Sequence, residues 1–335
     1  MDLRIALIAD THLGFDYSLR PKIIRRRRGT DFFENYEKAL AITMERKANV
    51  LVHGGDMFFR SKIPDPIVGM AYEPLLKVAE SGIKVLLVPG NHERSVLPDS
   101  PLFHHENVHV FDQPWTIVLP VNGHSIAFGG FPNVRNGVGP GFEQVLTMTG
   151  LLETVADLKV LCIHQSVDGS SVGPVNFTFR KGVDVIGRDQ IPADIPLVLS
   201  GHIHREQILR TTTGGYVVYP GSIDRTSFAE KFERKGFYII DAKIDGSPEF
   251  DFEFIQLDSR PMIDLELEPT LRESEHIQTF IEDKLKDLPQ DSIVRIVPRD
   301  EEQAHGLSAN VLRELAPKTM NIDLKYPRGI KYRAD

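Results

Sequence analysis

The sequence has one cysteine, one tryptophan and no apolar run of the roughly 20 residues that a membrane-spanning helix requires. A single thiol, Cys162, cannot form an internal disulfide, which is typical of proteins from reducing compartments. Cys162 lies within an apolar run, where we expect it to be a small buried side chain. The chain opens almost directly on a strand-like run, without a basic and then apolar leader, so we expect no secretion signal. These absences predict a cytoplasmic protein that does not enter a membrane.

An excess of positive charge is also missing. Lysine and arginine number 39 and aspartate and glutamate 47, which gives a formal net charge of -8. This balance argues against indiscriminate binding of nucleic acid, which usually requires a basic surface. It leaves room for a local basic groove, and bound divalent ions would add positive charge that the count omits. The length of 335 residues predicts one large domain and a small one.

Short apolar runs that end in Asp, Asn or His are what the sequence does have. In the stretch KVLLVPGNHER, residues 84–94, the apolar residues predict a strand buried on both faces, and Pro89 and Gly90 end it. Asn91 and His92 follow directly. Four further runs end in the same way, at Asp10 and His12, at Asp56, at His164, and at His202 and His204. Because ligands of open α/β sheets bind just beyond the strand ends, we expect these side chains to meet.

Asp, Asn and His side chains without thiolate suit manganese, iron or zinc. The candidate ligands are Asp10, His12, Asp56, Asn91, His164, His202 and His204. Seven ligands are too many for one ion but suit two ions that share a carboxylate. Two ions about 3.5–4 Å apart can clamp an in-line displacement at phosphorus, and they lower the pKa of bound water to about 7. His92 remains beside a ligand, where it could protonate the leaving oxygen.

Each candidate ligand also has a simpler interpretation when it is taken alone. Asp10 could be a turn residue at a strand end, and Asp56 could favour the turn that two glycines open. His164 alone would be typical of a histidine buried in a core. The recurrence of such residues at five strand ends favours a shared metal site over these separate interpretations.

Two further segments lie outside the ligand pattern. Four consecutive arginines, Arg25, Arg26, Arg27 and Arg28, could contact DNA phosphates or could form a solvated loop. After Arg260 the pattern changes to strand 263–267, a helix opened by a capping box of Thr270 and Glu273, strand 292–297, helix 308–315 and strand 322–326. We therefore expect domains at residues 1–258 and 259–335, the second with no ligand cluster.

The ligand motifs resemble a known family in order and spacing. Asp10-x-His12, Gly55-Asp56, Gly90-Asn91-His92, His164 and Gly201-His202-x-His204 are similar to the five motifs of calcineurin-like metallophosphoesterases. The resemblance implies an α/β fold, a two-sheet α/β/β/α sandwich with a small α+β capping domain. It also implies the division of ligands: Asp10, His12 and His204 hold one metal, Asn91, His164 and His202 the other, and Asp56 bridges them. His92 would then act on the leaving group and the scissile phosphate.

Other residues resemble one branch of that family, the SbcD-type and meiotic-recombination-eleven-type nucleases of DNA double-strand-break repair. They are residues 220–228, read as PGSIDRTSF, with Glu230, Lys235-Gly236-Phe237, residues 27–31 and Arg260-Pro261. This resemblance implies a 3'-5' exonuclease on double-stranded DNA and a single-strand endonuclease that act through metal-bound hydroxide. It implies two divalent ions, with Mn²⁺ the first choice and Fe²⁺, Zn²⁺ or Mg²⁺ as alternatives. It further implies a homodimer, a capping domain that helps to hold DNA, and an SbcC-type, SMC-like ATPase as partner.

The sequence departs from the branch at two positions and leaves other functions open. Phe59 stands where many of these nucleases have a histidine, and Glu93 follows His92 where the motif often has Asp. Glu93 and Arg60 are similar to residues of Ser/Thr protein phosphatases, a likeness that we interpret as coincidence. A phosphatase, a cyclic-nucleotide phosphodiesterase and a DNA-end-binding scaffold are the alternatives. Relatives of this type continue past the cap into a helical segment that binds the ATPase, whereas this sequence ends at Asp335, as a truncated or short variant would.

Overall fold

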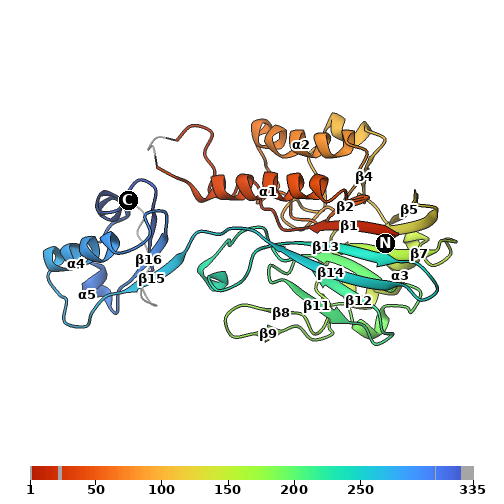
Figure 1. The fold of residues 1–335 in the computed structure, drawn as a ribbon. Helices are drawn as coiled ribbons and strands as arrows, with labels where there is room; N and C mark the ends of the chain where they lie inside the picture. The colour runs from red at the N-terminus through yellow and green to blue at the C-terminus, as the bar shows by residue number, and fades with distance from the viewer. Residues whose placement is uncertain (1, 22–24, 306, 326–335) are drawn as a thin grey trace. The chain divides into compact units, whose positions relative to one another are not determined.

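The chain forms two compact units in the computed structural model, which describes residues 2–21, 25–305 and 307–325 (Figure 1). The larger unit comprises Met1–Phe15 and Asp31–Asp258, and the smaller one comprises Asp16–Thr30 and Ser259–Asp335. Residues 16–30, which we expected in the first domain, therefore group with the C-terminal segment.

The larger unit contains two six-stranded sheets. The first has the order β14 (Glu249–Gln256), β13 (Gly236–Lys243), β1 (Leu3–Ile8), β2 (Val50–His53), β3 (Lys84–Leu87) and β4 (Val108–Val110). The second has the order β11 (Gln207–Arg210), β12 (Tyr216–Tyr219), β10 (Leu197–Gly201), β7 (Leu158–His164), β6 (His124–Gly130) and β5 (Trp115–Val121). Strands β1 to β4 are parallel, as are β6, β7, β10 and β12. A separate hairpin pairs β8 (Ser171–Val172) with β9 (Phe177–Thr178).

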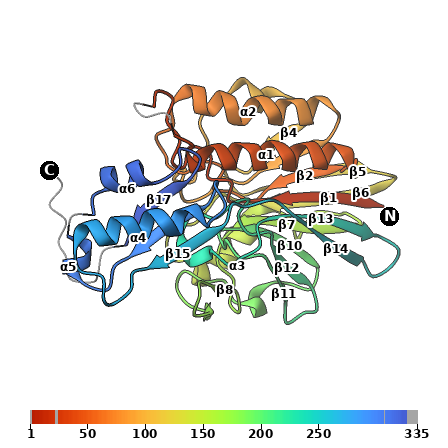
Figure 2. The ribbon, with the colours of Figure 1, turned by 60° about the vertical axis from the view of Figure 1, so that its left-hand side comes forward.

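The two sheets pack face to face and helices cover their outer faces. Buried side chains of both sheets, such as Leu7 and Val52 with Phe128 and Val160, share one apolar cluster. Helices α1 (Arg28–Glu45) and α2 (Asp65–Glu80) lie over the first sheet, and α3 (Val138–Thr149) packs on the second (Figure 2). This arrangement confirms the predicted α/β fold with two sheets between helices. Cys162 in β7 is fully buried, as expected.

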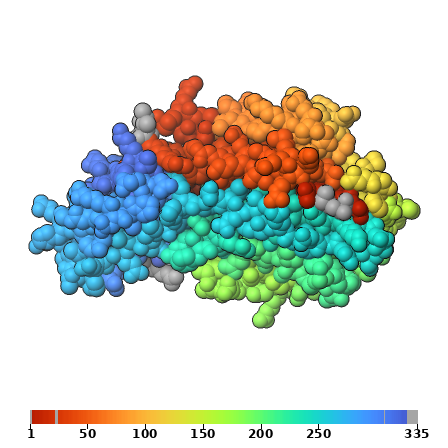
Figure 3. Space-filling view, in the orientation of Figure 1, coloured from red at the N-terminus to blue at the C-terminus, as the bar shows by residue number. Residues whose placement is uncertain are grey.

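The helix α1 also runs beside the edge strand β14. The carboxylate of Glu253 in β14 accepts a hydrogen bond from Arg46, directly after α1, at 2.5 Å, and Asn35 donates to the carbonyl of Asp258 at 2.9 Å. Figure 3 shows these two segments as adjoining bands on one face of the larger unit. These two contacts tie α1 and the residue after it to β14 and to the segment that follows it.

The smaller unit is built on a three-stranded parallel sheet of β15 (Met262–Glu266), β16 (Ile293–Val297) and β17 (Asn321–Leu324). Its helices are α4 (Ser274–Lys286), α5 (Glu301–Ala304) and α6 (Ala309–Leu315). The predicted capping box was wrong: α4 begins at Ser274, and its N-cap Glu273 makes no side-chain capping bond. The final strand corresponds to the predicted 322–326, whose last residue, Tyr326, lies outside the described residues.

Candidate metal centre

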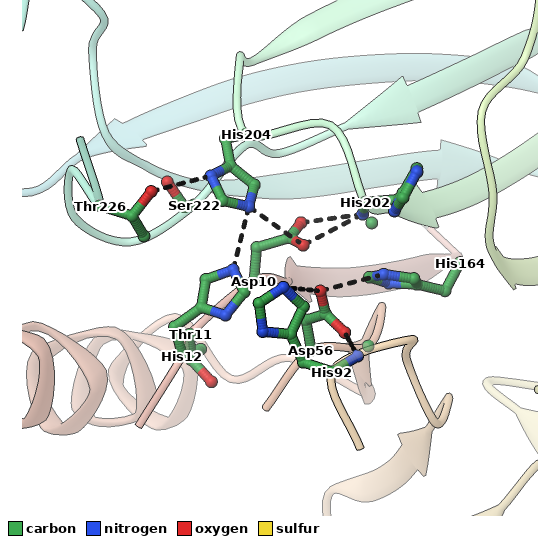
Figure 4. Close-up of polar contacts among 12 residues, drawn as sticks. Asp10, Thr11, His12, Asp56, His92, His164, His202, His204, Ser222 and Thr226 are labelled. Carbon is green, nitrogen blue, oxygen red and sulfur yellow. Dashed lines mark hydrogen bonds and ion pairs between the residues drawn. The ribbon is translucent and has the colours of Figure 1, made fainter. Parts of the chain in front are cut away.

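The five predicted strand ends meet at one edge of the larger unit. Asp10 and His12 follow β1, Asp56 follows β2, and Asn91 and His92 follow β3. His164 ends β7, and His202 and His204 follow β10. Figure 4 shows the imidazoles and carboxylates of these residues turned toward one another from both sheets. All seven predicted ligands and His92 are thus brought together.

The backbone is strained where it delivers these side chains. Asp10, His12, Asp56 and His202 have φ values of 50°, 42°, 50° and 84°, in the left-handed region that non-glycine residues rarely adopt. Each such residue costs of order 1–3 kcal/mol, and strain of this kind clusters at functional sites. Four of the seven predicted ligands therefore adopt a conformation that propensity alone would not select.

Two glycines allow the strand ends to approach closely. A Cβ at Gly90 would lie 2.2 Å from Oδ1 of Asp56, and a Cβ at Gly55 would lie 2.3 Å from Nδ1 of His164. Gly55 also has a φ of 102°. No larger residue fits at either position without displacing a candidate ligand.

One part of the site, which we call the Asp10 half, comprises Asp10, His12 and His204. The Nε2 atoms of His12 and His204 are 2.9 Å apart, and Nε2 of His204 is 3.9 Å from Oδ1 of Asp10. The Asp10 carboxylate accepts the His202 backbone N–H on both oxygens, at 3.0 and 3.1 Å. Ligand atoms of these three residues all lie within 4.8 Å of one another, as a shared metal ion requires.

The other part, the Asn91 half, comprises Asn91, His164 and His202. Oδ1 of Asn91 is 2.9 Å from Nδ1 of His202 and 3.1 Å from Nε2 of His164. Oδ2 of Asp56 is 3.4 Å from the same His164 nitrogen. Asp56 belongs to candidate groups with His12 and with His164, so its carboxylate lies between the two halves.

The donor set fits a cation in the Asn91 half. Nδ1 of His164 is 2.7 Å from the carbonyl oxygen of Gly54, so this nitrogen carries the proton and donates. When the ring is neutral, the lone pair of Nε2 faces the oxygens of Asn91 and Asp56. Three electron-rich atoms in a buried position repel one another unless a proton or a metal ion lies between them, so this position can accept a cation. In the Asp10 half, the buried Nδ1 atom of His12 has no hydrogen-bond partner among the described residues. The groups of Asp and His side chains in both halves therefore fit a metal site.

Burial and neighbouring charges shift the pKa values of the candidate ligands. Burial raises the pKa of the Asp10 carboxyl to about 6, despite the nearby histidines. Burial alone would raise the pKa of Asp56, but the neighbouring His164 outweighs it and lowers that pKa. Burial lowers the pKa of His202 to about 3 and that of His12 well below its usual value, so both imidazoles are neutral and can act as ligands. For His164 burial opposes protonation, but Asp56 and Asp10 outweigh it and raise the pKa to about 9.

The His92 side chain is 35% exposed, compared with 26% for His204 and 0–3% for Asp10, Asp56 and His164. Its Nδ1 atom is 2.7 Å from the carbonyl oxygen of Phe59, which it can reach as a donor, and its backbone N–H donates to Oδ1 of Asp56 at 2.9 Å. Its Nε2 atom lies 3.8 Å from Oδ2 of Asp56. The ring of Phe59 lies 5.7 Å from that of His92, between centroids, so an apolar ring stands at the position where the resemblance implied a histidine.

Sequence reasoning missed the role of Glu93. Its carboxylate is buried and accepts the backbone N–H groups of Phe58 at 2.7 Å and Gly90 at 3.0 Å. It therefore ties the turn after β2 to the turn after β3. Burial raises its pKa to about 8. Its place directly after His92 was the available signal.

The arginine run has a structural role that the sequence did not reveal. In the smaller unit, the guanidinium of Arg25 donates to the carbonyl oxygens of Pro317 and Met320 at 2.7 Å, to Ala316 at 2.9 Å, and to Arg313. It thus satisfies carbonyl groups at and after the end of α6. Arg27 pairs with Asp16 at 2.9 Å. DNA contact by Arg25, Arg26, Arg27 and Arg28 stays a prediction.

Comparison with known proteins points to one family. The family model for calcineurin-like phosphoesterases matches residues 3–206. The chain is 27% identical to the DNA double-strand break repair protein Mre11 of Methanocaldococcus jannaschii, over 78% of this chain and 68% of that protein. It is 26% identical to the SbcD component of the SbcCD nuclease of Bacillus subtilis, over 72% of this chain and 66% of that protein, and 25% identical to Mre11 of Archaeoglobus fulgidus, over 79% and 62%. The chain spans about two thirds of the length of these relatives.

Other comparisons add less. A dimetal phosphatase from Danio rerio aligns with 76% of this chain and 98% of its own at a TM-score of 0.47 and 11% identity, which is too weak a likeness to support a conclusion. Within residues 2–21, 25–305 and 307–325, no helix combines the length and apolar character needed to cross a bilayer.

Proposed function

Because the chain belongs to the calcineurin-like phosphoesterase family and is a metal-dependent phosphodiesterase, we propose that it hydrolyses phosphodiester bonds of DNA as a repair nuclease. The activity would comprise 3'-5' exonuclease action on double-stranded DNA and endonuclease action on single strands. Two observations support the proposal: the relatives named as Mre11 and as a component of the SbcCD nuclease, and the convergence of the predicted ligands at one edge of the larger unit. The second observation carries most weight, because it is a property of this chain itself.

The proposed ligands are the six residues of the two halves together with Asp56, which would bridge them. Two divalent ions held there, with Mn²⁺ as our first choice, supply Lewis acidity that activates water and neutralises charge on the phosphate. Imidazole, carboxylate and amide oxygen without thiolate suit Mn²⁺ or Fe²⁺, and Zn²⁺ and Mg²⁺ are the alternatives.

His92 is proposed to act directly on the substrate. With Nδ1 donating to the carbonyl of Phe59 at 2.7 Å, the ring is held so that Nε2 is directed toward the site. A protonated Nε2 could donate to the scissile phosphate and to the leaving oxygen. Its side chain is 35% exposed and can contact a substrate, whereas the side chains of Asp10 and His164 are fully buried.

The partners are proposed from the relatives. We expect a homodimer that acts on DNA together with an SbcC-type, SMC-like ATPase in the cytoplasm, and a smaller unit that serves as a capping domain for DNA. The Arg25–28 run would add contacts to DNA phosphates.

The test is hydrolysis of a DNA duplex labelled at either end, in Mn²⁺, Mg²⁺ or chelator, with wild type and His92→Ala side by side. We expect Mn²⁺-dependent loss of nucleotides from the 3' end that chelator and the substitution abolish. A chromogenic phosphodiester serves as the control substrate. Cleavage of that ester with DNA left intact would contradict the nuclease proposal and favour a phosphatase or a cyclic-nucleotide phosphodiesterase. Activity that survives His92→Ala unchanged would contradict the role of this residue.

A further inference from the structure

His204 has a second contact on the side of its ring that faces away from the other ligands. Its Nε2 atom faces His12 and Asp10, whereas its Nδ1 atom lies 3.3 Å from Oε1 of Glu230. Thr226 also approaches Nδ1, at 3.5 Å (Figure 4). One nitrogen of the ring is therefore directed into the candidate site, and the other faces a carboxylate.

The Glu230 carboxylate is fixed by several donors. Oε1 accepts the hydroxyl of Thr226 at 2.6 Å and that of Ser227 at 3.3 Å. Oε2 lies 2.7 Å from Nζ of Lys235, whose side chain is fully buried, and 3.3 Å from the backbone nitrogen of Thr226. A buried carboxylate with this many donors stays ionised and has a single orientation. Toward the His204 ring it can therefore act only as an acceptor, which requires the proton to be on Nδ1.

Lys235 links this carboxylate to the backbone of the ligand as well. Its ammonium donates to the carbonyl oxygen of His204 at 2.8 Å and to Oε2 of Glu233 at 3.2 Å. The pair of Glu230 and Lys235 thus holds both the ring and the main chain of His204. Glu233 offers a matched control, because it shares the lysine, whereas the carboxylate that meets Nδ1 of His204 is that of Glu230.

We propose that Glu230 is a positioning residue that fixes the Nδ1–H tautomer of His204 and thereby sets the affinity of the Asp10 half for a divalent ion. A carboxylate behind a ligating imidazole orients the ring and makes its other nitrogen more basic. The proposal rests on the proposed role of His204 as a ligand. In the Asn91 half the same task falls to the main chain, since Nδ1 of His164 donates to the Gly54 carbonyl at 2.7 Å.

Calorimetric titration with Mn²⁺ alone, without DNA, tests the proposal on three proteins: wild type, Glu230→Gln and Glu233→Gln. We expect wild type to bind two ions. In Glu230→Gln the affinity for one ion should fall by about 10–100-fold, the range usual for a lost outer partner of a ligand, while the other ion binds as before. Glu233→Gln should bind both ions as wild type does. Nitrogen-15 NMR of the histidine rings should show a protonated Nδ1 at His204 in wild type and a mixture of tautomers in Glu230→Gln.

Equal Mn²⁺ affinities and an unchanged His204 tautomer in wild type and Glu230→Gln would overturn the inference. If Glu230→Gln does not fold, the double variant Glu230→Gln/Lys235→Met replaces it, because that variant leaves no unpaired buried charge. A wild type that binds no Mn²⁺ would overturn the ligand assignment and this inference with it. A wild type that binds two ions without cleaving DNA would contradict the nuclease proposal and leave this titration valid.

Discussion

The two halves of the candidate site hold their ligands by different means. In the Asn91 half, His164 is oriented by a backbone carbonyl, that of Gly54. In the Asp10 half, His204 is oriented by a side chain, that of Glu230. A backbone carbonyl is present whatever the residue, whereas a carboxylate can be gained, lost or neutralised by one substitution. The Asn91 half is therefore determined by the fold, whereas the Asp10 half can be tuned by sequence.

The largest expected effect comes from the residue that both halves share. Asp56→Asn should lower phosphodiesterase activity by at least about 10³-fold, because the metal ions contribute several kcal/mol to the transition state. It should also remove the stabilisation that Mn²⁺ gives to wild type. Steady-state rates and thermal unfolding with and without Mn²⁺ check both effects, and near-normal rates in Asp56→Asn would show that the halves do not share this carboxylate.

Loss of one ligand should separate the halves. His204→Ala should lower the affinity for one Mn²⁺ ion, and His202→Ala should lower the affinity for the other. Each loss should exceed the roughly 100-fold loss of affinity expected when a hydrogen-bond partner of a ligand is removed. The measurement is calorimetric titration of each variant. If both substitutions abolish both ions, the halves are a single unit and the comparison between them fails.

Metal removal should lower stability by an amount that depends on the logarithm of the free metal concentration relative to the dissociation constant. A ligand present at 100 times its dissociation constant stabilises the folded state by about 2.7 kcal/mol per site, so chelator should lower the free energy of unfolding of wild type by that amount for each ion. Urea unfolding in Mn²⁺ and in chelator measures it. An equal free energy of unfolding in both conditions would mean that no ion is bound.

A smaller effect on stability is expected from substitution of Glu93, which links the turn after β2 to the turn after β3. The two oxygens of Glu93 accept the backbone N–H groups of Phe58 and Gly90. Glu93→Gln replaces one of these oxygens by an NH₂ group, which cannot accept a hydrogen bond, so one of the two backbone N–H groups loses its acceptor. The expected loss is about 1–3 kcal/mol of unfolding free energy. Urea unfolding in chelator measures it free of metal binding, with Glu73→Gln on the exposed face of α2 as the control. A loss no larger than that of the control would show that the two turns do not depend on Glu93.

Features that depend on residues adjacent in the chain could be predicted from the sequence, whereas features that depend on contacts between distant residues could not. The seven ligands could be predicted because a strand end and its next residues are adjacent in the chain, and the parallel topology brings such ends together. The two-sheet fold could be predicted from the same runs and the family resemblance. Glu230 could not be assigned its role, because its contact with His204 spans 26 residues and depends on how the segment between them folds back.

Arg25 shows the same limit in the smaller unit. Its charge suggested phosphate contact, but its guanidinium meets carbonyl groups about 290 residues later in the chain, such as that of Pro317, a pairing that no local pattern encodes. The capping box of Thr270 and Glu273 also failed, because the four-residue pattern does not determine where the helix begins. Local rules thus predicted side chains at strand ends better than they predicted contacts between distant segments.

The smallest effect on stability is expected from removal of the Arg25 side chain. Arg25→Ala should destabilise the smaller unit by about 1 kcal/mol, because several carbonyl groups near the end of α6 lose a donor and turn to water. It should leave Mn²⁺ affinity in both halves unchanged. Amide hydrogen exchange in α6 and β17, together with Mn²⁺ titration, checks the two statements. Faster exchange throughout the larger unit would contradict this local role.

Seven side chains at five strand ends are proposed to hold two metal ions, and the predictions for Asp56, His204, His202 and metal removal depend on that arrangement. Anomalous diffraction from crystals soaked in Mn²⁺ would locate the ions themselves. We expect two peaks, one among Asp10, His12 and His204 and one among Asn91, His164 and His202, with the Asp56 carboxylate between them. A single peak, or peaks away from these residues, would contradict the arrangement.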